Sequence, residues 1–328
     1  MNLNHFPKQS LGFFPTPLVE LPRLSEALGG PHLFIKRDDQ TGLAFGGNKT
    51  RKLEYLVGEA IAQGYDTLIT GGAEQSNHCR QTAAAAAAAG LSCHLVLGGE
   101  PPDVPNGNIL LDQLFGAEIH WNGKFRKGEK IPEIAEEIKR NGGKPYIIPY
   151  GASNATGALG FVAAVRELDV QMSEKGLEFS HVVFPSSSGG TQAGLICGSH
   201  LFSHKYQLIG IGIDKGETGG PPFEEQVLKL TNETSERLKL RLEFSSADII
   251  ICSDYWEEGY GVVGELERNA IRMVAEKEGI LLDPVYTGRA MGALIDMVQK
   301  GEFLPEEQIL FWHTGGTPAL FPYAPDLL

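Results

Sequence analysis

The chain has 328 residues, of which 42% are hydrophobic and 21% charged, the balance of an ordinary globular protein. Its formal net charge of −13 argues against nucleic-acid binding, which requires a basic face. No apolar run approaches the roughly 20 residues that span a bilayer, and residues 1–16 lack a secretory signal pattern. We therefore expect a cytoplasmic protein without a nucleic-acid or membrane partner.

The expected elements alternate between short apolar strands and longer segments of helical period. In chain order, the expected strands are Leu33–Lys36, Thr67–Thr70, His94–Leu97, Ala117–His120, Pro145–Ile148, His181–Phe184, Leu208–Ile213, Ile249–Cys252 and Ile309–Trp312. The expected helices between them are Lys49–Gln63, Asn77–Ala89, Asn108–Phe115, Ile131–Arg140, Ala155–Met172, Thr191–Phe202, Phe223–Leu230, Glu265–Lys277 and Gly288–Lys300. This alternation predicts an α/β protein with parallel sheets and helices on both faces.

The length and the absence of a low-complexity linker fit two doubly wound halves that share one interface. We place a small domain at residues 51–165. A large domain then comprises residues 1–50 together with residues 166–328, because the N-terminal segment is expected to return to the second half. The alanine run Ala83–Ala89 is typical of a closely packed buried helix.

Neither the cysteines nor the histidines predict a metal site. The sequence contains four cysteines, Cys79, Cys93, Cys197 and Cys252, which lack CxxC or metal-type spacing and are expected to be buried thiols. His200 and His204 lie four residues apart on an expected helix, a spacing that can bind metal. No Glu lies between them, so a solvated helix face is the favoured interpretation.

A serine- and glycine-rich turn follows the expected strand at His181–Phe184. The residues Ser186-Ser187-Ser188-Gly189-Gly190-Thr191 lead from this strand into a helix, where backbone N–H groups and the helix dipole can hold a phosphate. The turn matches neither G-x-G-x-x-G nor the P-loop, so a dinucleotide or nucleoside triphosphate is disfavoured. A tight connection with a serine N-cap remains the alternative.

Lys49 lies in the first turn of an expected helix, directly after Gly46-Gly47. Most lysines in such places are solvated, and a helix N-terminus disfavours a positive charge. That penalty, together with desolvation, would lower the pKa of the amine and favour the neutral form that imine chemistry requires. The residues alone make Lys49 one of several candidate lysines.

These segments together resemble a known family. The matching motifs are Lys36-Arg37-Asp38-Asp39, Gly46-Gly47-Asn48-Lys49-Thr50-Arg51-Lys52-Leu53-Glu54, Gln75-Ser76-Asn77-His78, the Ser/Gly turn, Asp283-Pro284-Val285-Tyr286-Thr287-Gly288 and His313-Thr314-Gly315-Gly316. They recur in order from about Pro15 to Tyr323 and resemble the D-cysteine desulfhydrase and 1-aminocyclopropane-1-carboxylate (ACC) deaminase family. That family has fold type II of the pyridoxal 5'-phosphate (PLP) enzymes, the tryptophan synthase β-like fold, and its members are usually homodimers acting on small amino acids.

The resemblance implies that PLP is carried as a Schiff base on Lys49. It also implies the remaining cofactor contacts: Asn77 at the 3-hydroxyl, Ser187, Ser188, Gly189, Gly190 and Thr191 at the phosphate, and Thr314 at the pyridine nitrogen. Ser76, Asn77 and His78 begin a helix and are expected to bind the substrate carboxylate. Without the resemblance, an ordinary N-cap would be the preferred interpretation.

Tyr260 and Tyr286 match family tyrosines on the substrate side, where a buried hydroxyl can hydrogen-bond or donate a proton to a leaving group. Tyrosines are more often half-buried packing residues. Together with Lys49 and Ser76, these two complete the catalytic residues that we expect.

Thr287 separates members of the family. ACC deaminases resemble D-P-V-Y-E-G at this place, with a glutamate near the pyridine ring, whereas this chain has Thr287. A threonine suits β-elimination of a good leaving group and favours D-cysteine desulfhydrase, which releases sulfide, pyruvate and ammonia. L-cysteate sulfo-lyase and ACC deaminase remain alternatives, and no residue decides the leaving group or the stereochemistry.

Two other classes of protein compete with an enzyme. A non-catalytic PLP-binding protein would keep Lys49 and the phosphate turn but would not need Tyr260, Tyr286 or Ser76, and all three are present. The second class is a plain sugar- or amino-acid-binding α/β protein, which sulfide release from D-cysteine would exclude. We therefore expect a PLP-dependent carbon–sulfur lyase.

Overall fold

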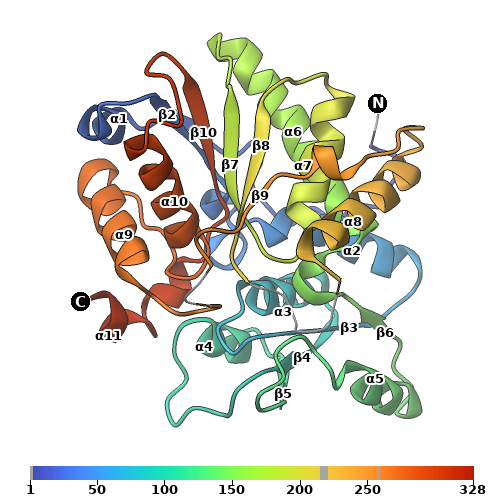
Figure 1. The fold of residues 1–328 in the computed structure, drawn as a ribbon. Coiled ribbons are helices and arrows are strands. Elements are labelled where there is room, and N and C mark those ends of the chain that lie inside the picture. Colours follow the sequence, from blue (N-terminus) through green and yellow to red (C-terminus); the bar gives the residue numbers. More distant parts are fainter. Residues whose placement is uncertain (1–2, 215–220, 257–258) are drawn as a thin grey trace.

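The computed structural model describes residues 3–214, 221–256 and 259–328 and contains two sheets flanked by helices (Figure 1). The strands are β1 (Leu18–Glu20), β2 (His32–Arg37), β3 (Thr67–Gly72), β4 (Ser92–Leu97), β5 (Glu118–Trp121), β6 (Pro145–Ile147), β7 (His181–Ser186), β8 (Gln207–Gly212), β9 (Ile251–Cys252) and β10 (Gln308–His313). The helices are α1 (Pro22–Leu28), α2 (Lys49–Ala62), α3 (Asn77–Ala89), α4 (Gly107–Leu114), α5 (Ile131–Arg140), α6 (Ala155–Lys175), α7 (Gly190–Leu201), α8 (Phe223–Leu238), α9 (Glu265–Glu278), α10 (Thr287–Gln299) and α11 (Ala324–Leu327).

The larger sheet has the strand order β1-β2-β10-β7-β8-β9, and the smaller sheet has the order β5-β4-β3-β6. All pairs are parallel except β1 with β2. In Figure 1 the larger sheet lies above the smaller one, with α9 and α10 on one side of it and α6 and α7 on the other. The predicted α/β class with parallel sheets and helices on both faces is confirmed.

Alternate residues of the central strands of the larger sheet belong to two separate hydrophobic cores. Phe311 pairs with Ile35 and Val183, and all three pack on the side of α9 and α10. The neighbouring residues Leu310 and Val182 face α6 instead. Because both faces are covered, these strands are almost continuously apolar, which explains why they could be recognised in the sequence.

The smaller sheet packs α2 and α3 on one face and α5 on the other. Ala83, Ala85 and Ala86 are fully buried in the core that α3 shares with α2. The closely packed alanine helix is confirmed for this half of the run, whereas Ala87 and Ala88 are exposed. All four cysteines are free; three are buried as expected, whereas Cys252 is half-buried.

The nine expected strands and nine expected helices are present with small shifts at their ends. The expectation was wrong for α8, which continues to Leu238. The residues after Leu230 lack an apolar period, yet Thr231, Thr234 and Ser235 are buried with Leu238 on the inner face of the helix. Three elements were not expected from the sequence: β1, α1 and α11. They have three, seven and four residues and are too short to show a period. β1 is also the one antiparallel strand described.

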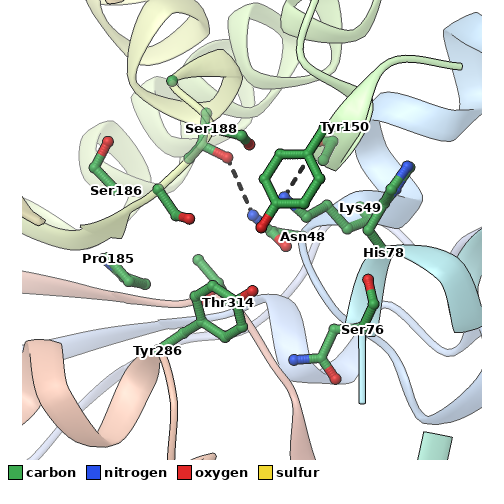
Figure 2. Close-up of a pocket in the computed structure, with 15 residues that line it drawn as sticks. Asn48, Lys49, Ser76, His78, Tyr150, Pro185, Ser186, Ser188, Tyr286 and Thr314 are labelled. Carbon is green, nitrogen blue, oxygen red and sulfur yellow. Dashed lines mark hydrogen bonds between the residues drawn. The ribbon is translucent and has the colours of Figure 1, made fainter. Parts of the chain in front are cut away.

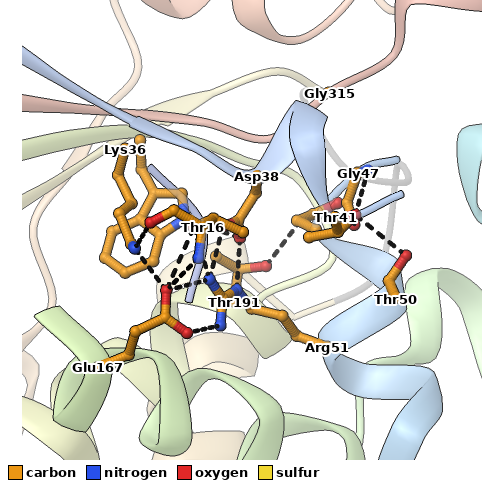
Figure 3. Close-up of polar contacts among 12 residues, drawn as sticks. Thr16, Lys36, Asp38, Thr41, Gly47, Thr50, Arg51, Glu167, Thr191 and Gly315 are labelled. Carbon is orange, nitrogen blue, oxygen red and sulfur yellow. Dashed lines mark hydrogen bonds and ion pairs between the residues drawn. The ribbon is translucent and has the colours of Figure 1, made fainter. Parts of the chain in front are cut away.

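A buried network of charges ties the larger sheet to α2 and α6 (Figure 3). Arg51 donates to both oxygens of Asp38, at 2.8 Å each, and to both oxygens of Glu167, at 3.0 and 2.9 Å. Lys36 donates to Glu167 and to the carbonyl oxygen of Thr16. Two cations therefore balance two carboxylates in the interior, where an unpaired charge would be costly.

Candidate active site

A glycine pair sets Lys49 at the first position of α2. Gly46 and Gly47 have φ values of 70° and 130°, which favour glycine. A Cβ atom on Gly46 would lie 2.0 Å from the carbonyl oxygen of Asp39, and one on Gly47 would lie 2.4 Å from Gln81 Nε2. The chain can turn this tightly into α2 because both positions lack a side chain.

Two lysine amines share one carbonyl oxygen at the centre of the site. Lys49 Nζ donates to Gly151 O at 3.2 Å, and Lys52 Nζ donates to the same oxygen at 3.1 Å. Burial lowers the pKa of Lys49 from 10.5 to about 8. Burial, and then the charge of Lys49, lowers the pKa of Lys52 well below its ordinary value. Near neutral pH, Lys49 therefore has an appreciable fraction of the neutral, nucleophilic amine.

The Ser/Gly turn joins β7 to α7 beside these lysines. Gly189 has a φ of 80° and directly precedes the first helical residue, Gly190. Ser188 Oγ hydrogen-bonds Ser153 Oγ at 2.7 Å, and the N–H group of Gly190 donates to the same Ser153 Oγ at 3.1 Å. Thr191 Oγ1 accepts a hydrogen bond from an Asn48 side chain.

This turn has the features of a phosphate site. The first N–H groups of α7 have no acceptor within the helix, and they lie at the positive end of its dipole. A Cβ atom on Gly190 would lie 2.9 Å from Lys52 Nζ, so a buried cation adjoins the turn. Lys52 is fully buried without a carboxylate among its hydrogen-bond partners, Gly151 and Ser153. A phosphate at this place would supply the missing negative charge.

Ser76 is the N-cap of α3, and its Oγ accepts a hydrogen bond from Cys79 N at 3.2 Å. Its hydroxyl proton is left to donate toward the pocket. Asn77 begins the helix, and its Oδ1 accepts a hydrogen bond from Asn108 Nδ2 at 3.0 Å. The N–H groups of Asn77 and His78 lie in the first turn of α3 and have no acceptor within the helix. This end of the helix can therefore bind an anion.

The ring of His78 is held by buried hydroxyls. Thr70 donates its proton to Ile148 O, so His78 Nε2 must be the donor in the 2.8 Å contact with Thr70 Oγ1. Burial, followed by the charges of Lys49 and Lys52, lowers the pKa of His78 well below its ordinary value. His78 therefore lines the pocket as a neutral ring whose Nε2 hydrogen is donated to Thr70 Oγ1.

Tyr286 and Tyr260 form a hydrogen-bonded pair, with 2.7 Å between the hydroxyl oxygens. Tyr286 lines the pocket, and Tyr260 lies behind it. Burial raises the pKa of both hydroxyls well above 10, so both remain protonated. The guanidinium carbon of Arg126 lies 4.3 Å from the centroid of the Tyr260 ring, and its Nη2 donates to Asp214 Oδ2 at 2.8 Å.

Thr287 points away from the pocket, whereas Thr314 lines it. Thr287 Oγ1 donates to Asp283 Oδ1 at 2.7 Å and is fully buried. Asp283 also accepts from the N–H groups of Val285, Tyr286 and Thr287. Of these two threonines, Thr314 is thus the one whose hydroxyl is available to the cavity.

Figure 2 shows Lys49, Ser76, Tyr150, Tyr286 and Thr314 around a single cavity. The lining residues described are Asn48, Lys49, Ser76, Asn77, His78, Tyr150, Gly151, Pro185, Ser186, Ser187, Ser188, Gly189, Thr191, Tyr286 and Thr314. The cavity thus brings together all of the expected site residues except Tyr260 and Gly190. Tyr260 contacts the pocket residue Tyr286 through a hydrogen bond, and the N–H group of Gly190 donates to Ser153 Oγ.

Four residues at the site were not expected from the sequence: Lys52, Tyr150, Gly151 and Ser153. Lys52 follows Lys49 by three positions, a spacing that places both on one helix face and could have indicated it. Tyr150, Gly151 and Ser153 lie around a short 3-10 turn, Tyr150–Ala152, that carries no motif. Only the packing of this turn against α2 and α7 brings them to the site.

The chain matches a family model described as "Pyridoxal-phosphate dependent enzyme" over residues 9–315. It is 45% identical over 332 aligned residues to a D-cysteine desulfhydrase of Klebsiella pneumoniae strain 342, with 99% of each chain covered. Among solved structures, an ACC deaminase homologue is 40% identical, with a TM-score of 0.90 and coverage of 99% of this chain and 96% of that one. Holo diaminopropionate ammonia lyase from Escherichia coli is 14% identical, with a TM-score of 0.71 over 99% of this chain and 90% of that one, a likeness of fold alone.

The site fits pyridoxal 5'-phosphate. Lys49 would hold the aldehyde carbon and the α7 turn with Lys52 the phosphate, while Asn77 and Thr314 would flank the ring. When bound, the cofactor withdraws electrons from the substrate's α-carbon. The chain therefore belongs to the pyridoxal-phosphate dependent enzymes and, within them, to the D-cysteine desulfhydrase and ACC deaminase family, and pyridoxal 5'-phosphate is its cofactor.

Proposed function

We propose that the protein is a D-cysteine desulfhydrase. The net reaction converts D-cysteine and water to hydrogen sulfide, pyruvate and ammonia: the α-proton is lost, the Cβ–S bond breaks with its electron pair on sulfur, and water replaces nitrogen. The observation that carries the proposal is the composition of the pocket. Among its described lining residues there is no Asp, Glu or Arg, and Lys49 is the one charged side chain.

A pocket of hydroxyl and amide groups suits a substrate with an uncharged side chain. The sulfonate of L-cysteate would add a second anion without a second cation to receive it, since Arg126 is paired with Asp214. Opening the ACC ring demands a stronger electron sink, which a carboxylate at the pyridine nitrogen would give. Thr314 offers a neutral hydroxyl instead, and Thr287 is turned toward Asp283.

Lys49 is proposed to remove the α-proton once the substrate amine has displaced it. Its lowered pKa favours this role, because an amine with a pKa of about 8 is partly deprotonated at neutral pH. Ser76 is proposed to donate its hydroxyl proton to the substrate carboxylate, since its oxygen already accepts from Cys79. The backbone N–H groups of Asn77 and His78 would complete this carboxylate site.

Tyr286 is proposed to protonate the departing sulfur. Its hydroxyl faces the pocket and remains protonated, because burial raises its pKa well above 10. Tyr260 is proposed to orient it and return the proton through their 2.7 Å hydrogen bond. A PLP-binding protein without catalysis would have no use for such a buried pair of hydroxyls.

The test is a substrate panel of D-cysteine, L-cysteine, L-cysteate, β-chloro-D-alanine and ACC, scored for sulfide, sulfite, pyruvate and 2-oxobutyrate. We expect the highest kcat/KM for D-cysteine. Greater activity on ACC or L-cysteate would overturn the assignment, and an inactive protein that is yellow with bound PLP would show a carrier or sensor.

The variant Tyr286→Phe tests whether Tyr286 donates a proton to the leaving group or only contributes to substrate binding. We expect kcat with D-cysteine to fall about 100-fold, in the range of general acid catalysis. β-Chloro-D-alanine, whose leaving group needs no proton, should be nearly unaffected. Equal losses on both substrates would argue that Tyr286 only shapes the pocket.

We further propose a cytoplasmic homodimer with a small domain at residues 51–165 and a large domain at residues 1–50 plus 166–328. The strands of the smaller sheet all lie between Thr67 and Ile147, which supports this division. In the described part of the chain, no helix is long and apolar enough to cross a membrane. Light scattering of the purified protein would give its oligomeric state, and a monomeric mass would exclude the dimer.

A further inference from the structure

Three potential metal ligands gather on one face of the smaller sheet, outside the active-site pocket. His94 on β4 pairs in register with Glu118 on β5, and His120 pairs with Val96. Because side chains two residues apart share a face of a strand, His94, Glu118 and His120 project to the same side. The face is the one that α5 covers, where Val96 packs against the isoleucines of that helix.

The distances between the candidate ligand atoms fit a single small ion. His94 Nδ1 lies 3.0 Å from His120 Nε2 and 3.7 Å from Glu118 Oε2, and His120 Nε2 lies 3.4 Å from Glu118 Oε1. A tetrahedral zinc ion with bonds of ~2.0–2.1 Å separates its ligands by roughly 3.3 Å. The two histidine nitrogens and the Glu118 carboxylate, each histidine facing a different one of its oxygens, therefore stand at about the spacing of three corners of such a tetrahedron.

The chemistry of the ligands and their access to solvent also favour a site for a metal ion. Two imidazole nitrogens and one carboxylate suit a late first-row divalent ion and leave a fourth position for water. The histidine side chains are 17% and 19% exposed, whereas Glu118 is 65% exposed, so the rings are held in place while the open side admits an ion. Ring packing with an interplanar angle of 11° further fixes the two histidines relative to each other.

We propose that His94, Glu118 and His120 bind one Zn²⁺ ion, which joins the edge strand β5 to β4. In the metal-free protein, the 3.0 Å contact between the histidine nitrogens is a hydrogen bond. Zinc replaces that bond by coordinating both nitrogens. The site revises the sequence-based expectation of no metal, because its two histidines are 26 residues apart and only strand pairing brings them together.

The test titrates the untagged, PLP-loaded protein with zinc chloride after treatment with a chelator. Calorimetry should show one zinc per chain in the wild type, and none at this affinity in the His94→Ala/His120→Ala variant. Glu118→Gln should weaken binding at least about tenfold, since even outer-shell partners of a metal contribute 10–100-fold. As Glu118 is mostly exposed, this variant keeps the test valid if the double variant fails to fold.

The matched control is His200→Ala/His204→Ala, which removes two histidines that contact separate carboxylates, Asp248 and Asp169. It should bind zinc as the wild type does. Cobalt substitution should give the intense visible bands of a tetrahedral site in the wild type and the control. Wild-type protein that binds no zinc, or unchanged binding in either cluster variant, would overturn the proposal.

Discussion

Lys49 and Lys52 show how two similar residues acquire different roles one helical turn apart. Both amines contact Gly151 O, but Lys49 is half-buried and faces the pocket, whereas Lys52 is fully buried beside the α7 turn. The sequence motif indicated the first and not the second, because burial depends on the packing of α2 against other elements. Each lysine supports a separate prediction.

For Lys49, the rate at which the apoprotein takes up PLP should rise about tenfold per pH unit below pH 8 and level off above it. The reason is that only the neutral amine attacks the aldehyde, and its pKa is lowered to about 8. Stopped-flow absorbance of the yellow product measures the rate. A rate that keeps rising to pH 10, as for an exposed lysine, would contradict the lowered pKa; Lys49→Ala should give no such product.

For Lys52, substitution by Met should weaken PLP binding roughly tenfold or more, because a hydrogen bond to a charged group contributes about 1.5–3 kcal/mol. The melting temperature of the apoprotein should stay the same or rise, since the variant removes a desolvated amine without a carboxylate partner. Calorimetry and thermal unfolding of both forms measure this pair of effects. Equal destabilisation of apo and holo forms would indicate a purely structural role.

At the scale of elements, the start of α10 couples helix capping to the active site. Asp283 accepts hydrogen bonds from the N–H groups of Val285, Tyr286 and Thr287 and from the Thr287 hydroxyl. The Asp-Pro-Val-Tyr motif was recognised in the sequence for its tyrosine. Its aspartate lies outside the pocket lining and instead fixes the turn that aims Tyr286 at the cavity.

Asp283→Ala should therefore lower both stability and turnover. Loss of this cap should decrease the free energy of unfolding by about 1–2 kcal/mol, and kcat should fall because Tyr286 loses its backbone anchor. Thr287→Val is the matched control, since it removes one donor and should have a smaller effect on both. Urea unfolding and steady-state kinetics measure the two quantities, and an unchanged kcat in Asp283→Ala would exclude the positioning role.

At the scale of the whole molecule, the charge network around Arg51 connects β2 of the larger sheet to the helices α2 and α6 (Figure 3). Burial raises the pKa of Glu167, but the charge and hydrogen bonds of Arg51, with those of Lys36, outweigh it and lower the pKa to about 2. A depressed carboxylate pKa stabilises the fold above the unfolded value of about 4.5. That contribution is lost as pH falls toward 2.

Glu167→Gln should decrease the free energy of unfolding at pH 7 by about 3–5 kcal/mol, because it leaves Lys36 and Arg51 with one carboxylate between them. Between pH 4.5 and pH 2 the variant should lose less stability than the wild type. Chemical unfolding across this range measures both differences. Parallel pH profiles for the two proteins would show that Glu167 does not titrate with folding.

By itself the sequence determined the succession of strands and helices, since period and burial on both faces are local properties of the chain. The ordered motifs also indicated Lys49 and the Ser/Gly turn, whose glycines Gly46, Gly47 and Gly189 adopt positive φ angles in the structure. Tertiary structure alone decided that Lys52 lies beside that turn, that Thr287 turns toward Asp283, and that His94 meets His120. These contacts depend on helix packing, turn geometry and strand register, which join residues that no local pattern relates.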